Sequence, residues 1–230
     1  AGGVASPGAV SEPLVFVAVT PLILAVVLSA SRGEAFLQAT FSATVTWLIN
    51  LPWIIKVMSY YGGLPLPVGV ILYVITCVAL GVFAGVFFGM SVFGMRLGRS
   101  PIVWLLVPLS WVTVEYARTW LLSGFPWNQL AAALVDLPAM VQVDRLIGPY
   151  GTGFLIMIPA TCLAWLFTVK APARDRLIAS TAVIAFIALW LLSGISQLRA
   201  QWARMQHESR TVVALLQPNI SQEMRWREST

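Results

Sequence analysis

Long apolar runs separated by short polar connections are the main pattern in this sequence. A helix needs about 20 mostly apolar residues to cross a bilayer. Runs close to or above that length cover residues 14–30, 36–55 (interrupted by Asn50 and Pro52), 66–95, 102–122, 148–169 and 177–195. Backbone polar groups cannot be left unpaired in lipid, so each run is expected to be a helix. The pattern therefore predicts an all-α membrane helical bundle over residues 1–196, with about six spans.

The composition supports a membrane protein. Hydrophobic residues make up 59% of the chain and charged residues 10%, whereas soluble domains carry about 25% charged residues. The net charge of +5 could favour nucleic acid, but the bases are divided into small groups between apolar runs, which is typical of membrane-protein loops. We therefore expect no nucleic-acid partner. Cys77 and Cys162 lie within apolar runs without metal-ligand spacing, so we interpret them as buried hydrophobes and predict no metal and no cofactor.

The bases also predict an orientation, because cytoplasmic loops are enriched in Lys and Arg. One set of alternating connections contains Arg32, Arg96, Arg99, Lys170, Arg174 and Arg176, and the other contains Lys56 and Arg145. The first set is therefore expected in the cytoplasm. Loops 56–65 and 123–147, and everything after residue 195, are expected to face outward.

Residues after the sixth run change in character. Segment 197–210 is polar with an apolar stripe of Leu198, Trp202 and Met205, which predicts an interfacial linker helix lying along the membrane surface. The β-branched run at 211–219, closed by Pro and Asn, predicts a strand. A single strand is not stable alone, so residues 211–230 are expected to begin a second, β-containing domain. Export of that domain would account for the bases in 199–210 on the outward side.

The segment VEYARTWLLSGFPWNQL, residues 114–130, carries the most informative polar residues. Glu115 and Arg118 share one face of the fourth predicted span, where charge is costly unless it is paired or hydrated. The two residues are interpreted either as an ion pair that fixes packing and ties down the following loop, or as a polar entrance in which Arg118 meets a phosphate or carboxylate.

Two aromatic turns are predicted on the same outward side. One consists of Gly124, Phe125, Pro126 and Trp127; the other surrounds Gly62 and Gly63 after two tyrosines. They form either a platform on the outer leaflet or a simple belt of interfacial aromatic anchors.

Glycines 81, 85 and 89 recur at four-residue spacing in the third run. They predict a close-packing ridge for another helix, or reflect the tolerance of membrane helices for glycine.

Three separate motifs resemble one known family. They are the Trp53 to Val68 segment with its GGxPxPV ending, the ExxRxWLLxGFPWxQ segment from Glu115 to Gln129, and RTVVALLQPNISQEMRW at 210–226. In that order they resemble apolipoprotein N-acyltransferase. The resemblance implies a bacterial inner-membrane enzyme with about eight spans and a periplasmic nitrilase-like (carbon-nitrogen hydrolase) α/β domain. Such an enzyme moves an acyl chain from a phospholipid, through a cysteine thioester, to the diacylglyceryl-cysteine of an apolipoprotein.

The resemblance also implies what this chain lacks. The family's Glu–Lys–Cys triad follows the strand and is expected beyond Thr230, so no catalytic residue is assigned and the chain alone is expected to be inactive. The family's first span is expected before residue 14. Trp226 matches a tryptophan near the family's active site, which makes it a candidate substrate-binding residue. The resemblance transfers no chemical role to Glu115, Arg118 or the GFPW turn.

Two other classes of function fit parts of the sequence. A small transporter or channel could use Glu115 and Arg118 as an intramembrane site, but the chain shows no internal repeats of the kind such bundles have. A noncatalytic scaffold could dock a separate hydrolase-like chain. The residues that follow Thr230 in the gene would decide between these alternatives.

Overall fold

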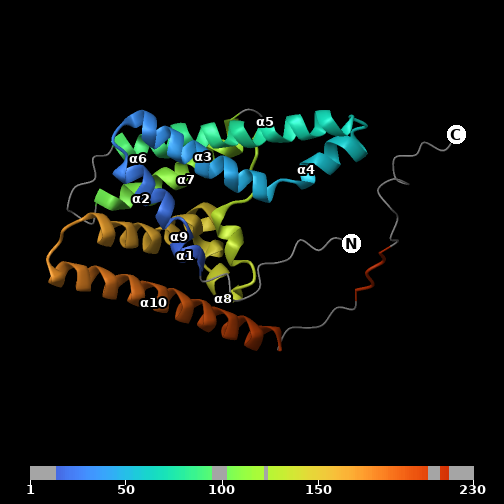
Figure 1. Ribbon diagram of the computed structural model, residues 1–230. Helices are drawn as coiled ribbons and strands as arrows, with labels where there is room; N and C mark the ends of the chain where they lie inside the picture. The colour runs from blue at the N-terminus through green and yellow to red at the C-terminus, as the bar shows by residue number, and fades with distance from the viewer. Residues whose placement is uncertain (1–13, 95–102, 122–123, 207–212, 218–230) are drawn as a thin grey trace.

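A computed structural model describes residues 14–94, 103–121, 124–206 and 213–217, and every regular element among them is helical (Figure 1). The elements before residue 95 are α1 (Val15–Ala18), α2 (Thr20–Leu28), α3 (Arg32–Asn50), α4 (Trp53–Lys56), the π-helical turn η2 (Val57–Tyr61), α5 (Leu66–Ala84), the π-helical turn η3 (Gly85–Gly89) and α6 (Met90–Gly94). Those that follow are the 3-10 turn η4 (Val103–Leu105), α7 (Leu106–Trp120), the 3-10 turn η6 (Leu130–Leu134), α8 (Pro138–Val141), α9 (Asp144–Thr168) and α10 (Ala173–Met205).

The helices that could cross a membrane are fewer than the sequence predicts. Within the described ranges, three are long and apolar enough (Leu66–Phe93, Asp144–Thr168 and Ala173–Met205), and a bent pair, Arg32–Asn50 with Trp53–Tyr61, would make a fourth. The first predicted span forms only the short apolar helix Val15–Leu28, which ends at the non-helical Ser29. The fourth forms α7, whose 15 residues extend about 22 Å, short of a hydrocarbon core of about 30 Å. The described helices therefore do not show six spans, and that number stays a prediction.

The bent pair and α5 form a long helical hairpin that projects beyond the rest of the molecule on the right of Figure 1. At its start, the Ser31 hydroxyl accepts a hydrogen bond from the Glu34 N–H, and a Glu34 carboxylate oxygen accepts one from the Ala30 N–H. The pair of bonds resembles a capping box, except that Glu34 accepts from the residue before the N-cap. The helix bends by 56° after Asn50, at the interruption that Asn50 and Pro52 indicate in the sequence.

A ridge of small residues joins the hairpin's two arms. Along α5 and η3 the residues Gly69, Tyr73, Cys77, Gly81, Gly85 and Gly89 are buried at four-residue spacing. A Cβ at Gly89 would lie 2.7 Å from the Ala35 carbonyl oxygen and 2.8 Å from the Ala39 methyl carbon, both on α3. The interpretation of these glycines as a close-packing ridge is confirmed, because any side chain there would separate the arms.

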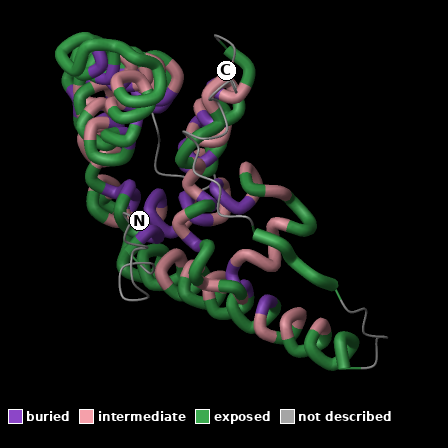
Figure 2. The backbone as a smooth tube through the Cα atoms, turned by 90° about the vertical axis from the view of Figure 1, so that its right-hand side faces the viewer, coloured by how far each residue is buried: buried purple, intermediate pink, exposed green. Residues whose placement is uncertain are grey.

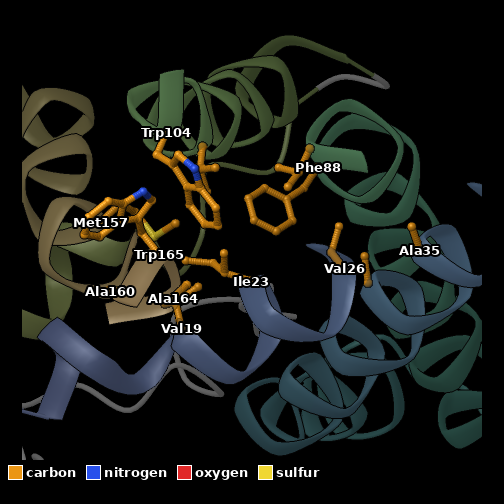
Figure 3. Close-up of a cluster of buried hydrophobic side chains, with 13 residues drawn as sticks. Val19, Ile23, Val26, Ala35, Phe88, Trp104, Met157, Ala160, Ala164 and Trp165 are labelled. Atoms are coloured by element: carbon orange, nitrogen blue, oxygen red, sulfur yellow. The ribbon is translucent and has the colours of Figure 1, made fainter. Parts of the chain in front are cut away.

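The second half of the molecule is built around α9. Figure 3 shows side chains of α2, η3, η4 and α9 converging on one cluster, in which Ile23, Phe88, Trp104 and Met157 are at most 2% exposed. α9 is kinked at Gly148, whose φ of 66° and ψ of 177° are not helical. Figure 2 shows buried residues in the interior and exposed residues along the outer faces of the helices.

The last helix, α10, runs unbroken from Ala173 to Met205 and is mostly exposed. It is attached through Trp190, whose indole N–H donates to the Met140 carbonyl at 3.0 Å, and through Gly194, which lies directly against the Ala139 carbonyl. The residues expected to form an interfacial linker helix continue α10 as far as Met205. Their position at the membrane surface stays a prediction.

The predicted strand at 211–219 is not formed in the part of it that the structure describes. Residues 213–217 have no regular secondary structure and are exposed. A strand needs neighbouring strands to pair with, and the described part of the chain supplies none. The other residues of 211–230, Trp226 among them, lie outside the described ranges.

Candidate functional site

The candidate site lies at the C-terminal end of α7, where the two charged residues singled out in the sequence are both buried. Glu115 is 3% exposed and Arg118 is 8% exposed. Their shared face of α7 points toward α9 and the aromatic turn rather than away from the protein. Charges this deep require compensation from nearby groups of opposite charge or from hydrogen bonds.

Glu115 is compensated by the loop that follows the helix. Its Oε1 accepts a hydrogen bond from the Leu130 N–H at 2.7 Å. Leu130 opens η6, a helical turn with no side-chain cap of its own, so the carboxylate satisfies a free N–H at its start. The other oxygen, Oε2, lies over α9, where a Cβ added to Gly153 would be only 3.2 Å away. Glu115 thereby holds the returning loop against α9.

Arg118 is compensated mainly by an aromatic ring and by the charge of Glu115. Its guanidinium lies 4.7 Å from the centre of the Trp47 ring, a cation–π arrangement with α3. Among the residues that the structure describes, no hydrogen-bond partner is found for its buried Nε and Nη2, for Glu115 Oε2 or for the Trp111 indole nitrogen. We call Trp111, Glu115 and Arg118 the polar cluster. Attraction between the opposite charges across the cluster offsets part of their desolvation.

The aromatic turn GFPW packs onto the bend between α3 and α4. The Phe125 N–H donates to the Arg118 carbonyl at 2.8 Å, and the Phe125 ring meets Trp47 edge to face with centroids 6.0 Å apart. Trp127 lies against Trp53, with ring centroids 5.1 Å apart. Gly124 has a φ of 83°, a conformation that favours glycine. Pro126 is exposed at the outside of the turn.

The turn around Gly62 and Gly63 lies at the tip of the hairpin. Gly63 has a φ of 68°, and a Cβ on Gly62 would lie 2.6 Å from the Met58 carbonyl oxygen. The Lys56 ammonium lies 5.7 Å from the centre of the Tyr60 ring. The contact between Trp53 and Trp127 joins the GFPW turn to the start of α4. The turn at Gly62 and Gly63 lies at the other end of α4 and η2.

Several contributors to the site could not be identified from the sequence. Leu130, Gly153 and Trp47 take part through backbone or ring contacts that carry no local signal. Tyr150 shares a hydrogen bond of 2.5 Å between its hydroxyl and that of Thr119, which joins α9 to the end of α7. The spacing of Glu115 and Arg118 indicates a shared helical face, but only the fold shows what that face meets.

The sequence model of the family described as "Apolipoprotein N-acyltransferase N-terminal domain" matches residues 3–162, which include both aromatic segments and the polar cluster. The chain belongs to this family. The resemblance identified from its three motifs is thereby confirmed.

Curated relatives named apolipoprotein N-acyltransferase align over most of the chain. The Shewanella oneidensis protein is 30% identical over 181 residues, which are 77% of this chain and 33% of the relative. The Geobacter metallireducens protein is 28% identical over 228 residues (96% and 41%), and the Methylococcus capsulatus protein is 27% identical over 233 residues (98% and 44%). The chain spans less than half the length of each of these relatives.

The two cysteines of this family member lie inside helices and away from the polar cluster. Cys77 is fully buried in the ridge against α3, and Cys162 is half-buried within α9. No group of three or more His, Cys, Asp or Glu side chains among the described residues could hold a metal ion. The contacts of the candidate site join the end of α7 to η6, to α9 and to Trp47 of α3.

Proposed function

We propose that this chain is the membrane part of an enzyme that transfers an acyl chain from a phospholipid to the N-terminal diacylglyceryl-cysteine of apolipoproteins. The transfer proceeds through a thioester on a cysteine of a nitrilase-like domain that follows α10. The family match and the names of the relatives support the acyltransferase assignment. The thioester route and the triad come from the resemblance of the motifs.

The observation that carries the proposal is the contact between Trp53 and Trp127. It joins segments more than 70 residues apart, each part of a motif by which the chain resembles the family. α10 contacts the short segment between α8 and α9, because the Gln201 side-chain amide donates a hydrogen bond to the Gln142 side-chain oxygen at 2.9 Å. The chain thus leaves α10 beside the segment that connects the GFPW turn to α9 (Figure 1).

The chemistry explains why an acyltransferase would need such a surface. Donor and acceptor are both anchored in the bilayer, so their reacting groups can meet a thiolate only at the membrane surface. Rigid aromatic turns are suited to that depth. The role of this part of the enzyme is to hold the lipid-bound ends beneath a reaction centre that supplies the nucleophile, base and oxyanion stabilisation.

The test is to isolate the full gene product after growth with a labelled fatty acid. We expect a hydroxylamine-sensitive acyl thioester on a cysteine outside residues 1–230. The variants Cys77→Ser and Cys162→Ser are expected to retain the label, and residues 1–230 expressed alone are expected not to acquire it. Loss of the label in either cysteine variant, or absence of any thioester in the full protein, would contradict the proposal.

The proposed orientation has its own test. We expect a reporter fused after Ile195 to be exported to the periplasm, and one fused within 170–176 to remain in the cytoplasm, because the second segment contains three bases. The reverse pattern would place the aromatic segments in the cytoplasm and remove the basis for lipoprotein acylation.

A further inference from the structure

A groove lies where α9 ends and α10 begins, at the opposite end of the molecule from the aromatic segments (Figure 1). Its volume is about 530 Å³, and its lining residues are Leu166, Ala171, Ala173, Arg176, Leu177 and Ser180. Part of this lining is cationic or polar and the remainder is apolar. The groove belongs to neither the polar cluster nor the aromatic turns.

The charge around the groove is positive. Arg176 lines it, and Lys170 and Arg174 flank it in the sequence, with Asp175 as the one nearby carboxylate in segment 170–176. Three bases and one carboxylate leave a local charge of +2. α10 also begins here without a side-chain cap, so the positive end of its dipole adds to the field. The groove is electrostatically complementary to a phosphate group.

Large apolar side chains beside the groove are exposed. Leu177 is 69% exposed, Ile178 55% and Phe167 71%. A ligand that used only the cations would leave Leu166 and Leu177 in contact with water. A ligand with a phosphate and adjoining hydrocarbon chains satisfies both parts of the lining.

We propose that this groove binds the headgroup of an anionic phospholipid as a resident lipid in the leaflet opposite the aromatic segments. The phosphate lies at Arg176, Ser180 and the start of α10, and the acyl chains follow Leu166 and Leu177 into the bilayer. Basic pockets between helices at a membrane surface bind lipid headgroups in this way. The lipid is not consumed, so the proposal does not rest on acyl transfer.

Native mass spectrometry of the detergent-solubilised protein tests the proposal. Phosphatidylglycerol and phosphatidylcholine with identical acyl chains are titrated separately, and phosphatidylglycerol is expected to bind more tightly. Each cation near a membrane surface contributes about fivefold in affinity for anionic lipid. The double variant Arg174→Gln/Arg176→Gln is therefore expected to lower the affinity for phosphatidylglycerol by roughly 25-fold. It should lower the affinity for phosphatidylcholine by a smaller factor, because the choline cation leaves that headgroup without net charge.

The matched control removes the same charge at the other end of the molecule. Lys56→Gln/Arg145→Gln is expected to leave phosphatidylglycerol binding unchanged, with circular dichroism showing that both double variants are folded. Ala173→Leu fills the groove without altering charge and is expected to weaken phosphatidylglycerol binding as well.

Three results would overturn the proposal. They are equal losses in the two double variants, equal affinity for the two lipids, and displacement of phosphatidylglycerol by inorganic phosphate at an equal concentration. The last result would assign the site to a free anion.

Discussion

Two contacts between helices in this protein are built from different kinds of residue. The contact of α3 with α5 and η3 uses glycines, so that the helix backbones approach closely. Its polar groups are uncharged: threonine hydroxyls of α3 face Gly81 and Gly85, and the Tyr73 hydroxyl donates to the Leu48 carbonyl. The contact of α7 with η6 and α9 uses a buried carboxylate and a buried guanidinium. The first contact fixes two long helices to each other. The second fixes the surface turn that follows α7.

The two contacts meet at Trp47. Its ring belongs to the same buried cluster as Tyr73 and Cys77 of the α5 ridge. The ring also contacts the Arg118 guanidinium and the Phe125 ring. The position of the GFPW turn therefore depends on both contacts. Breaking either contact should move the aromatic segments, but the two changes should lower the free energy of unfolding by different amounts.

The largest effect is expected for Glu115→Ala. The substitution removes the cap on Leu130 and leaves Arg118 buried without its counter-charge, a change that costs about 3 to 5 kcal/mol. Unfolding with SDS in mixed micelles, followed by circular dichroism, measures the change in free energy. The double variant Glu115→Leu/Arg118→Leu is expected to lose less than Glu115→Ala, because no unpaired charge remains. A single variant within 1 kcal/mol of the unsubstituted protein would contradict the structural role of the charge.

A smaller effect is expected for Gly89→Ala. The added Cβ would approach the Ala35 carbonyl oxygen and the Ala39 methyl, and overpacking of this kind costs about 1 to 3 kcal/mol. The same unfolding assay applies. Gly33→Ala is the matched control, because its nearest neighbour would be 3.8 Å away, and it is expected to be neutral or stabilising. Equal free energies of unfolding for the two variants would show that the helix only tolerates glycine at position 89 and does not need it for packing.

The smallest effect is expected for the aromatic pair. A double-mutant cycle on Trp53→Ala and Trp127→Ala should give a coupling of about 0.5 to 1.5 kcal/mol, since their ring centroids are 5.1 Å apart. Trp202 is 64% exposed and lies near the end of α10. A cycle on Trp53 and Trp202 is expected to give no coupling. Coupling of equal size in both cycles would mean that the effect is not local.

The sequence predicts the helical class and the bend after Asn50 because apolar run length and a proline are local signals. The glycine ridge is also readable, since four-residue spacing marks one face of a helix. Span number is less predictable. The run at 14–30 is apolar throughout, but the helix that it forms, Val15–Leu28, is shorter than the run, because Ser29 with its ψ of 140° is not helical.

The site is only half predictable for a related reason. Glu115 and Arg118 stand out because charge is rare in an apolar run. Their partners are a backbone N–H at Leu130 and a ring at Trp47, and both are brought to them only by tertiary structure. The strand predicted at 211–219 depends on pairing with other strands, which the described residues do not contain.

The central claim is that the buried charge of Glu115 holds the GFPW turn against the hairpin. Double electron–electron resonance between spin labels at Leu64 and Asn128, both exposed, tests it directly in a background with Cys77→Ser and Cys162→Ser. We expect one narrow distance distribution that broadens in Glu115→Ala and, to a smaller extent, in Glu115→Gln, but not in the exposed control Asp175→Asn. A distribution that is already broad without substitution, or that stays narrow in Glu115→Ala, would contradict the claim.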